Sequence, residues 1–127
     1  MLRDIDATAM LAVKDVGIAK GFYEEALGFE PIDIGIEGMV RYESGSASIL
    51  VYESEYAGTN QANALAWSVG GRFDAIVGDI RARGVTFEHY DLPGLTREGD
   101  VHVAENFKGV WFKDPDGNGW TIQEKPA

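Results

Sequence analysis

The chain has 127 residues, and 45% of them are hydrophobic, so it can bury the core of one compact domain. A formal net charge of −10 argues against nucleic-acid binding, and the absence of Cys excludes disulfides, thiolate nucleophiles and Cys-ligated metal sites. No apolar run reaches the roughly 18 residues of a membrane span, and the first residues lack the pattern of a signal peptide. We therefore expect a cytoplasmic protein with no membrane partner.

The first half begins with a predicted strand and a predicted helix. The apolar segment 9–13 precedes Asp15, a residue type that caps helix N-termini, and an apolar stripe at helical spacing follows. The stripe consists of Val16, Ala19, Phe22, Tyr23, Ala26 and Leu27. Gly28 then stands where a left-handed residue commonly ends a helix. Three β-like segments follow at 30–36, 39–43 and 48–53.

The second half repeats this order. The apolar segment 64–69 is followed by a helical stripe and by Gly84 at the equivalent cap position. The stripe consists of Phe73, Ile76, Val77 and Ile80, and β-like segments follow at 85–90, 110–113 and 120–124. Because both halves predict the order β-α-β-β-β, we interpret 1–127 as a single domain, with module one at about 5–54 and module two at about 62–126.

The second half also contains an extra segment between its helix and its last two strands. This segment, 91–108, is rich in charged residues and contains Pro and Gly, so we predict a long loop with a short strand at 101–104. Its His102 and the nearby His89 stand among acidic residues, but their spacing matches no metal-binding motif. We interpret both as ordinary imidazoles in a solvated acidic loop.

Two short motifs indicate a family. The first helix ends with Phe-Tyr-Glu-Glu-Ala-Leu-Gly-Phe at 22–29, and the last two strands are joined by Asp-Pro-Asp-Gly-Asn at 114–118. In this order on a duplicated scaffold, the motifs resemble the vicinal oxygen chelate superfamily of glyoxalases, bleomycin-resistance proteins and extradiol dioxygenases. The resemblance implies an α+β fold in which two tandem βαβββ modules form a curled mixed sheet around a cleft. It also implies a small-molecule ligand and, as in many members, a homodimer.

The resemblance also locates the metal site of the superfamily's enzymes. Their ligands come from the first and last strands of each module, and the equivalent positions in this chain are Thr8, Leu50, Ala64 and Thr121. Divalent metals usually need three or more carboxylate or imidazole ligands from the protein, and these four residues offer none. We therefore expect no metal and no cofactor.

Strand alternation sorts the neighbouring residues by face. If the four vacated positions face the cleft, several aromatic, small and polar residues face it too. The predicted ligand-binding residues are Met10, Tyr42, Tyr52, Ser68, Trp111, Thr121 and Gln123. This inferred wall has no carboxylate and no His. It suits a planar or apolar ligand that stacks on the rings, and equally a set of rings that only fill the cleft.

The residues leave three functions open. The first, which we favour, is a metal-free protein of the glyoxalase/bleomycin-resistance type that holds an apolar or aromatic small molecule in a cleft. The second is an enzyme of the same fold, a lyase, isomerase or dioxygenase-like protein with non-standard catalytic residues, for which His102 and Glu105 are the candidates. The third is a structural or regulatory subunit whose cleft is filled.

Overall fold

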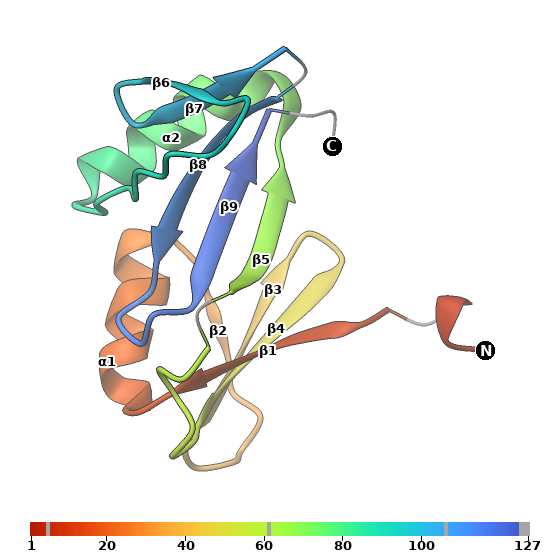
Figure 1. Cartoon of the computed structure of the whole chain (residues 1–127). Coiled ribbons are helices and arrows are strands. Elements are labelled where there is room, and N and C mark those ends of the chain that lie inside the picture. The colour runs from red at the N-terminus through yellow and green to blue at the C-terminus, as the bar shows by residue number, and fades with distance from the viewer. Residues whose placement is uncertain (5, 61, 106, 125–127) are drawn as a thin grey trace. The chain divides into compact units, whose positions relative to one another are not determined.

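The computed structural model has two compact units, each built around one mixed β-sheet (Figure 1). It describes residues 1–4, 6–60, 62–105 and 107–124. The first unit comprises Met1–Gln61 and Pro115–Asn118, and the second comprises Ala62–Asp114 and Gly119–Ala127. Two mixed sheets with few helices match the predicted βαβββ modules and confirm the α+β class.

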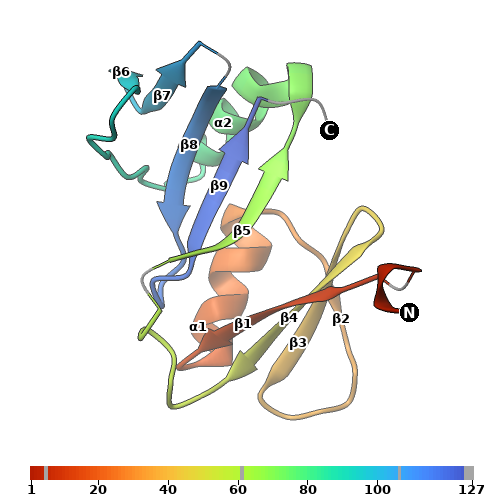
Figure 2. The same cartoon turned by 45° about the vertical axis from the view of Figure 1, so that its right-hand side comes forward.

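The first unit contains a four-stranded sheet with the strand order β1-β4-β3-β2. Its elements are η1 (Leu2–Asp4), β1 (Thr8–Val13), α1 (Val16–Lys20), the π-helical segment η2 (Gly21–Ala26), β2 (Pro31–Ile32), β3 (Met39–Ser44) and β4 (Ala47–Glu53). Strand β1 runs parallel to β4, and the other neighbours are antiparallel. Figures 1 and 2 show α1 against one face of this sheet, and in the described part of the unit no helix covers the other face.

Helix α1 begins where the sequence predicts a cap. The Asp15 carboxylate accepts hydrogen bonds from the backbone N–H groups of Gly17 (2.8 Å) and Ile18 (3.2 Å). The helix then widens into η2, in which the Leu27 N–H donates to the Phe22 carbonyl five residues earlier. The predicted first helix is therefore confirmed, with a wider second half.

The strand expected at 30–36 is shortened to β2. Beyond β2, the Asp33 carboxylate accepts a hydrogen bond from the Gly35 N–H (2.8 Å), and Gly35 has a φ of 70°. Because this side-chain bond turns the backbone, the rest of the segment does not pair with β3 in the described chain.

The core of the first unit lies between the helix and the sheet. The buried sheet residues, each at most 4% exposed, are Leu11, Val13, Val40, Tyr42, Ile49 and Val51. Ala19 and Tyr23 from the helical segments are fully buried. Complete burial of one large aliphatic side chain contributes about 1.5–3 kcal/mol, so this face holds the unit together.

The second unit contains a five-stranded sheet with the strand order β5-β9-β8-β7-β6. Its elements are β5 (Asn63–Ser68), η3 (Gly70–Arg72), α2 (Phe73–Ala82), β6 (Thr96–Glu98), β7 (Val101–Ala104), β8 (Phe107–Lys113) and β9 (Gly119–Gln123). Its buried apolar residues include Phe73, Val77, Ile80, Phe87, Val110, Phe112, Trp120 and Ile122.

Gly28 and Gly84 follow the helical segments of the first and second unit with φ angles of 77° and 91°, as predicted. No helix in the described residues has the length and hydropathy needed to cross a bilayer.

The segment predicted as a long loop, 91–108, is largely a β-hairpin. Strands β6 and β7 pair with each other, and β7 pairs with the beginning of β8. The short strand expected at 101–104 is confirmed, whereas the strand expected at 85–90 is reduced to one bridge between Glu88 and Trp111. Two segments therefore pair with the same edge of β8. Strand β7 pairs with its first residues, 107–109, and Glu88 bridges to Trp111 further along.

The turn that joins β8 to β9 contacts the end of β1. The Asp116 carboxylate accepts a hydrogen bond from the Lys14 backbone N–H (3.0 Å), and the Asn118 side-chain amide donates to the Ala12 carbonyl (3.0 Å). Partners in these two bonds are 102 and 106 residues apart in the chain. We call this pair of bonds the turn–β1 contact.

Candidate functional site

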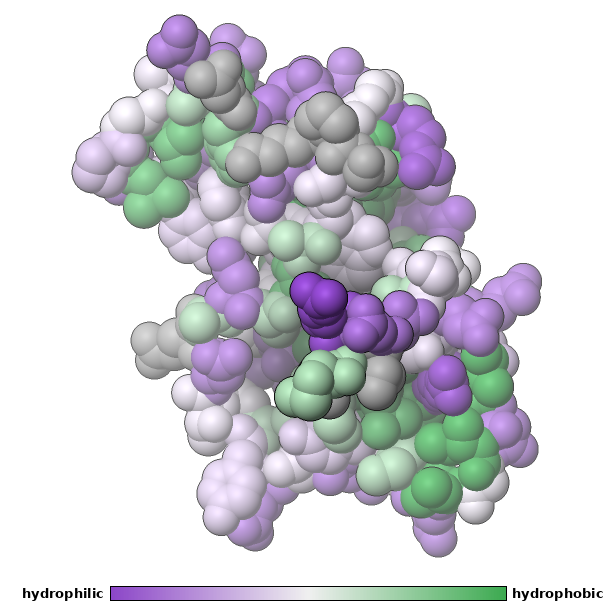
Figure 3. Space-filling view, turned by 90° about the vertical axis from the view of Figure 1, so that its right-hand side faces the viewer, coloured by the Kyte–Doolittle hydropathy of each residue, from purple (hydrophilic) through white to green (hydrophobic). Residues whose placement is uncertain are grey.

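The first sheet has a face without a helix, on which strand pairing aligns three rows of residues across β1, β4 and β3. The rows are Thr8–Ser48–Glu43, Met10–Leu50–Arg41 and Ala12–Tyr52–Met39. We call these nine residues the first open face. Met10 is 56% exposed, and Leu50 and Tyr52 are half-buried, so apolar side chains are accessible on this face. Figure 3 shows hydrophobic side chains gathered on the surface of the first unit, at the lower right.

The prediction that Tyr42 faces a ligand is wrong. Tyr42 pairs with the core residue Ile49 and is fully buried on the helix side of the sheet. Its hydroxyl donates to the Glu24 carboxylate (2.9 Å), and its ring packs against those of Tyr23 and Phe29. Burial, and then the Glu24 carboxylate, raise the pKa of the Tyr42 hydroxyl. Tyr42 therefore belongs to the core of the first unit.

Two charged residues that the sequence analysis missed lie on the first open face. Arg41 pairs with Leu50, and Glu43 pairs with Ser48. The Arg41 guanidinium donates to the Ser48 hydroxyl (2.9 Å). Because side chains alternate along a strand, a shift of one residue exchanges Tyr42 for these two neighbours. The expected wall without carboxylates is therefore wrong for this face.

The second sheet also has a face without a helix in the described chain. One row across β7, β8, β9 and β5 is His102–Gly109–Gln123–Ser68, and the next is Trp111–Thr121–Ala66, with Glu88 beside Trp111. We call these eight residues the second open face. Four predicted ligand-binding residues are thus brought onto one face, namely Ser68, Trp111, Thr121 and Gln123. Ser68 is exposed, Trp111 and Gln123 are half-buried, and Thr121 is 3% exposed.

Trp111 is the centre of an aromatic cluster. Its ring meets those of His102 and Tyr90 edge-on, with centroids 4.8 Å and 5.7 Å away. The Phe107 ring lies tilted against it at 5.6 Å. These contacts fix the orientation of the indole, and edge-on aromatic pairs are each worth about 0.5–1.5 kcal/mol beyond their burial.

His102 lies in a strand, which corrects its expected position in a solvated loop. It is fully buried in β7, and its Nε2 accepts a hydrogen bond from the Tyr90 backbone N–H (2.9 Å). Glu105 is exposed in the turn after β7. In the described chain no hydrogen bond or ion pair joins the two candidates, so they do not form an acid–base pair here.

A carboxylate and an amine that the sequence analysis did not combine also occur beside Trp111. Glu88 is the bridge partner of Trp111, and its Oε1 lies 3.8 Å from the Lys113 Nζ. Both side chains are partly exposed. This loose ion pair places a proton acceptor and a cation beside the second open face. Glu88 reaches Trp111 through an isolated bridge of the 85–90 segment, and the sequence contains no signal for that bridge.

His89 lies in a separate network at the surface. Its Nε2 lies 2.7 Å from the Asp100 Oδ1, and its Nδ1 accepts from the Arg97 guanidinium (2.9 Å). The hydrogen bond from His89, and then the Arg81 guanidinium, hold the pKa of Asp100 below its usual value. Because both ring nitrogens of His89 are engaged, neither is free to bind a metal.

The amino-acid sequence of this chain matches one protein family over most of its length. The model of the Glyoxalase/Bleomycin resistance protein/Dioxygenase superfamily matches residues 5–122. The chain belongs to this superfamily. No curated protein sequence matches it significantly.

Solved structures of superfamily proteins share the fold. The glyoxalase/bleomycin resistance protein from Catenulispora acidiphila is 26% identical, with a TM-score of 0.67, over 95% of this chain and 98% of its own. Oxidase ChaP-H2 is 24% identical, with a TM-score of 0.68, over 95% and 93%. The fosfomycin resistance protein FosX from Listeria monocytogenes is 17% identical, with a TM-score of 0.64, over 95% and 90%. Such different activities on one fold mean that function must be argued from the site.

The four residues predicted to replace the metal ligands of the superfamily's enzymes do not suit a metal by their chemistry. The residues predicted to stand at those positions are Thr8, Leu50, Ala64 and Thr121, of which two have no donor atom in the side chain and two have only a hydroxyl. Ala64 lies at a bulge in β5, where the register with β9 shifts. Within the described residues there is also no group of three or more His, Asp or Glu side chains that could hold a metal.

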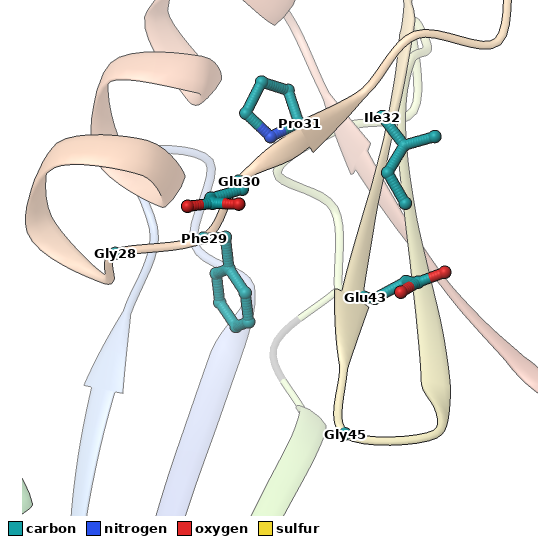
Figure 4. Close-up of a pocket in the computed structure, with 7 residues that line it drawn as sticks. All are labelled: Gly28, Phe29, Glu30, Pro31, Ile32, Glu43 and Gly45. Atoms are coloured by element: carbon teal, nitrogen blue, oxygen red, sulfur yellow. The ribbon is translucent and has the colours of Figure 1, made fainter.

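A pocket of about 450 Å³ opens in the first unit where β2 and β3 separate (Figure 4). It is lined by Gly28, Phe29, Glu30, Pro31, Ile32, Glu43 and Gly45. The carboxylates of Glu30 and Glu43 have no ion-pair partner in the part of the chain that is described, so the pocket disfavours anions. None of the seven predicted ligand-binding residues lines it, which separates it from the predicted site.

Proposed function

We propose that this superfamily member is a metal-free small-molecule-binding protein that holds an apolar or aromatic ligand beside Trp111. The supporting observation is the second open face, where the Trp111 indole contacts three neighbouring aromatic rings and lies beside polar side chains. Stacking on the indole would supply affinity, and hydrogen bonds from Ser68, Thr121 and Gln123 would orient the ligand. The predictions for Met10 and Tyr52 concern the first open face, in the other unit, and are not part of this proposal.

The proposal is tested by equilibrium dialysis of the purified protein against 2-ethylnaphthalene, a flat apolar probe. We expect saturable binding with one probe per chain. Trp111→Ala should weaken it about tenfold, equivalent to about 1.4 kcal/mol, because the stacking partner is lost. Tyr56→Ala is the matched control, since Tyr56 is a 71% exposed aromatic residue outside both open faces. Equal binding by the wild type and Trp111→Ala would contradict the assignment of Trp111.

An enzyme is the second candidate, and the Glu88–Lys113 pair is the observation that favours it. A carboxylate beside a binding surface can accept a proton from a ligand, and an amine can stabilise the charge that develops. The two functions differ in the fate of a natural ligand captured from cell extract. A binding protein returns the ligand unchanged, whereas an enzyme converts it and loses that conversion in Glu88→Gln.

We also propose a homodimer. The first open face exposes Met10 together with half-buried apolar side chains, and a second copy is a common cover for such a face. Sedimentation velocity at micromolar concentration should give twice the mass of one chain. A monomeric mass would exclude the homodimer and leave the binding proposal intact.

A further inference from the structure

His102 is a fully buried histidine with one unsatisfied nitrogen. Its Nε2 accepts the hydrogen bond of the Tyr90 backbone N–H, whereas its Nδ1 is buried and has no hydrogen-bond partner among the described residues. Buried polar atoms without a partner are uncommon in folded proteins, since each costs about 1–3 kcal/mol. This atom therefore calls for a reason beyond packing.

The partner of Nε2 fixes the protonation of the ring. A backbone N–H only donates, so Nε2 must be an acceptor and carries no proton. A neutral imidazole then carries its proton on Nδ1. The unsatisfied atom is therefore a hydrogen-bond donor, and its lone-pair chemistry is not available for a metal.

The position of His102 relates this donor to the proposed binding surface. His102 shares a row of the second open face with Gly109 and Gln123 and touches the Trp111 ring edge-on. The Tyr90 ring, 37% exposed, contacts both the His102 and Trp111 rings. Because His102 is fully buried, a ligand reaches its ring only if a neighbouring side chain moves, and Tyr90 is the more exposed of these two neighbours.

We propose that His102 is a fixed hydrogen-bond donor that selects aromatic ligands carrying an oxygen acceptor, such as a carbonyl group. The inference rests on the proposed binding function and specifies its ligand class. A flat ligand stacked on Trp111 places a substituent beside the imidazole, and an acceptor oxygen there satisfies the Nδ1–H. An N–H contact to the indole face is the alternative partner, but such contacts are weaker than a bond to a carbonyl oxygen.

The test compares two probes of nearly the same shape. In 2-acetylnaphthalene a carbonyl oxygen accepts hydrogen bonds, and in 2-ethylnaphthalene the corresponding position carries only hydrogens. Wild-type protein should bind the acetyl probe about threefold to tenfold more tightly in equilibrium dialysis, as expected for one neutral hydrogen bond. His102→Gln, whose side-chain oxygen can still accept the Tyr90 N–H, should bind both probes alike.

A second measurement uses the wild type and does not depend on the variant's folding. Long-range ¹H–¹⁵N NMR spectra of the His102 ring should report the Nδ1–H tautomer in the free protein. The Nδ1 proton should shift downfield with the acetyl probe and stay in place with the ethyl probe.

The outcomes separate the two proposals. Equal affinity of the wild type for both probes, or an Nε2–H tautomer, overturns the role of His102 and leaves the binding function standing. Saturable binding of neither probe overturns the proposed function, and the inference falls with it. Tighter binding of the acetyl probe that survives in a folded His102→Gln protein assigns the selection to another donor and also overturns the inference.

Discussion

At the scale of single residues, the Tyr42 hydroxyl links the helical part of the first unit to its sheet. The hydroxyl is buried and donates to the carboxylate of Glu24 in η2. Tyr42→Phe removes this bond and keeps the ring contacts with Tyr23 and Phe29. We expect a loss of about 1–2 kcal/mol in the free energy of unfolding at pH 7, measured by urea denaturation. An unchanged free energy would mean that water replaces the bond without cost.

The same hydroxyl makes stability depend on alkaline pH. Burial, and then Glu24, raise the Tyr42 pKa above its usual value of 10.0, so the folded state keeps a proton that the unfolded chain loses. Its contribution to stability is therefore complete below pH 10 and declines as the pH rises further. Tyr42→Phe should remove this part of the alkaline decline, and a spectrophotometric titration of the wild type should show a late-titrating Tyr that is missing in Tyr42→Phe.

Tyr42 also shows a limit in predicting from the sequence which face of the sheet a strand residue occupies. Alternation correctly assigned Met10, Tyr52 and Trp111 to the helix-free faces, because each lies in a strand whose register follows from the modules. It failed for Tyr42, since the position equivalent to Trp111 is Arg41, one residue away. The turn between β3 and β4 has only two residues, Gly45 and Ser46, and an error of one residue in placing it reverses the face.

At the scale of elements, the β6–β7 hairpin is held to α2 by charged groups. The Arg81 guanidinium of α2 lies 3.0 Å from the Asp100 carboxylate in the hairpin turn, and His89 bonds to the other carboxylate oxygen. Asp100→Asn should lower the free energy of unfolding by about 1 kcal/mol at pH 7, since both partners are partly exposed. Asp79→Asn is the control, because Asp79 pairs with Arg83 only at the helix surface and should matter less.

The effect of Asp100→Asn should depend on acid pH. The His89 bond, and then Arg81, lower the Asp100 pKa from 3.8, so the carboxylate stabilises the fold above that value. The stabilisation is lost as the pH falls through the lower pKa of the folded state. The wild type and Asp100→Asn should therefore converge in stability at pH values well below 3.8. A stability difference that persists at such a low pH would show that it does not arise from the charge of Asp100.

This hairpin was beyond prediction from the sequence for a physical reason. Strand β6 consists of Thr96, Arg97 and Glu98, which are all exposed and show no apolar alternation. Strand β6 pairs with β7, which in turn pairs with the open edge of β8, and Asp100 between β6 and β7 contacts α2, so its formation depends on tertiary effects. The predicted strand at 101–104 was recognisable because its apolar residues alternate.

The turn–β1 contact leads to a prediction for the first unit. Asn118→Ala removes the partner of the Ala12 carbonyl, and Asp116→Ala removes that of the Lys14 N–H. We expect losses of about 2 and 1 kcal/mol, respectively, because Asn118 is buried and Lys14 is exposed to water. Thermal unfolding followed by circular dichroism measures both. Asp91→Ala, in an exposed loop, should be neutral, and equal losses in all three variants would contradict a specific contact.

At the scale of the whole molecule, the proposed metal-free state has a direct consequence. The four residues predicted at the metal-binding positions offer no carboxylate or imidazole, so chelation should not change the stability of the protein. We expect the same unfolding midpoint with EDTA as with added nickel, zinc, manganese or iron, and negligible metal by elemental analysis of unchelated protein. A lower midpoint in EDTA, or stoichiometric metal that resists dialysis, would contradict the proposal.

The turn–β1 contact also matters for the order in which the chain emerges from the ribosome. Strand β1 leaves the exit tunnel early, but the side chains that bond the Ala12 carbonyl and the Lys14 N–H arrive only after β8. During synthesis the first unit therefore lacks these two hydrogen bonds until most of the second unit has been translated. Although the sequence repeats one unit twice, a gene cut between the copies would encode a first unit that lacks both bonds and the four residues 115–118.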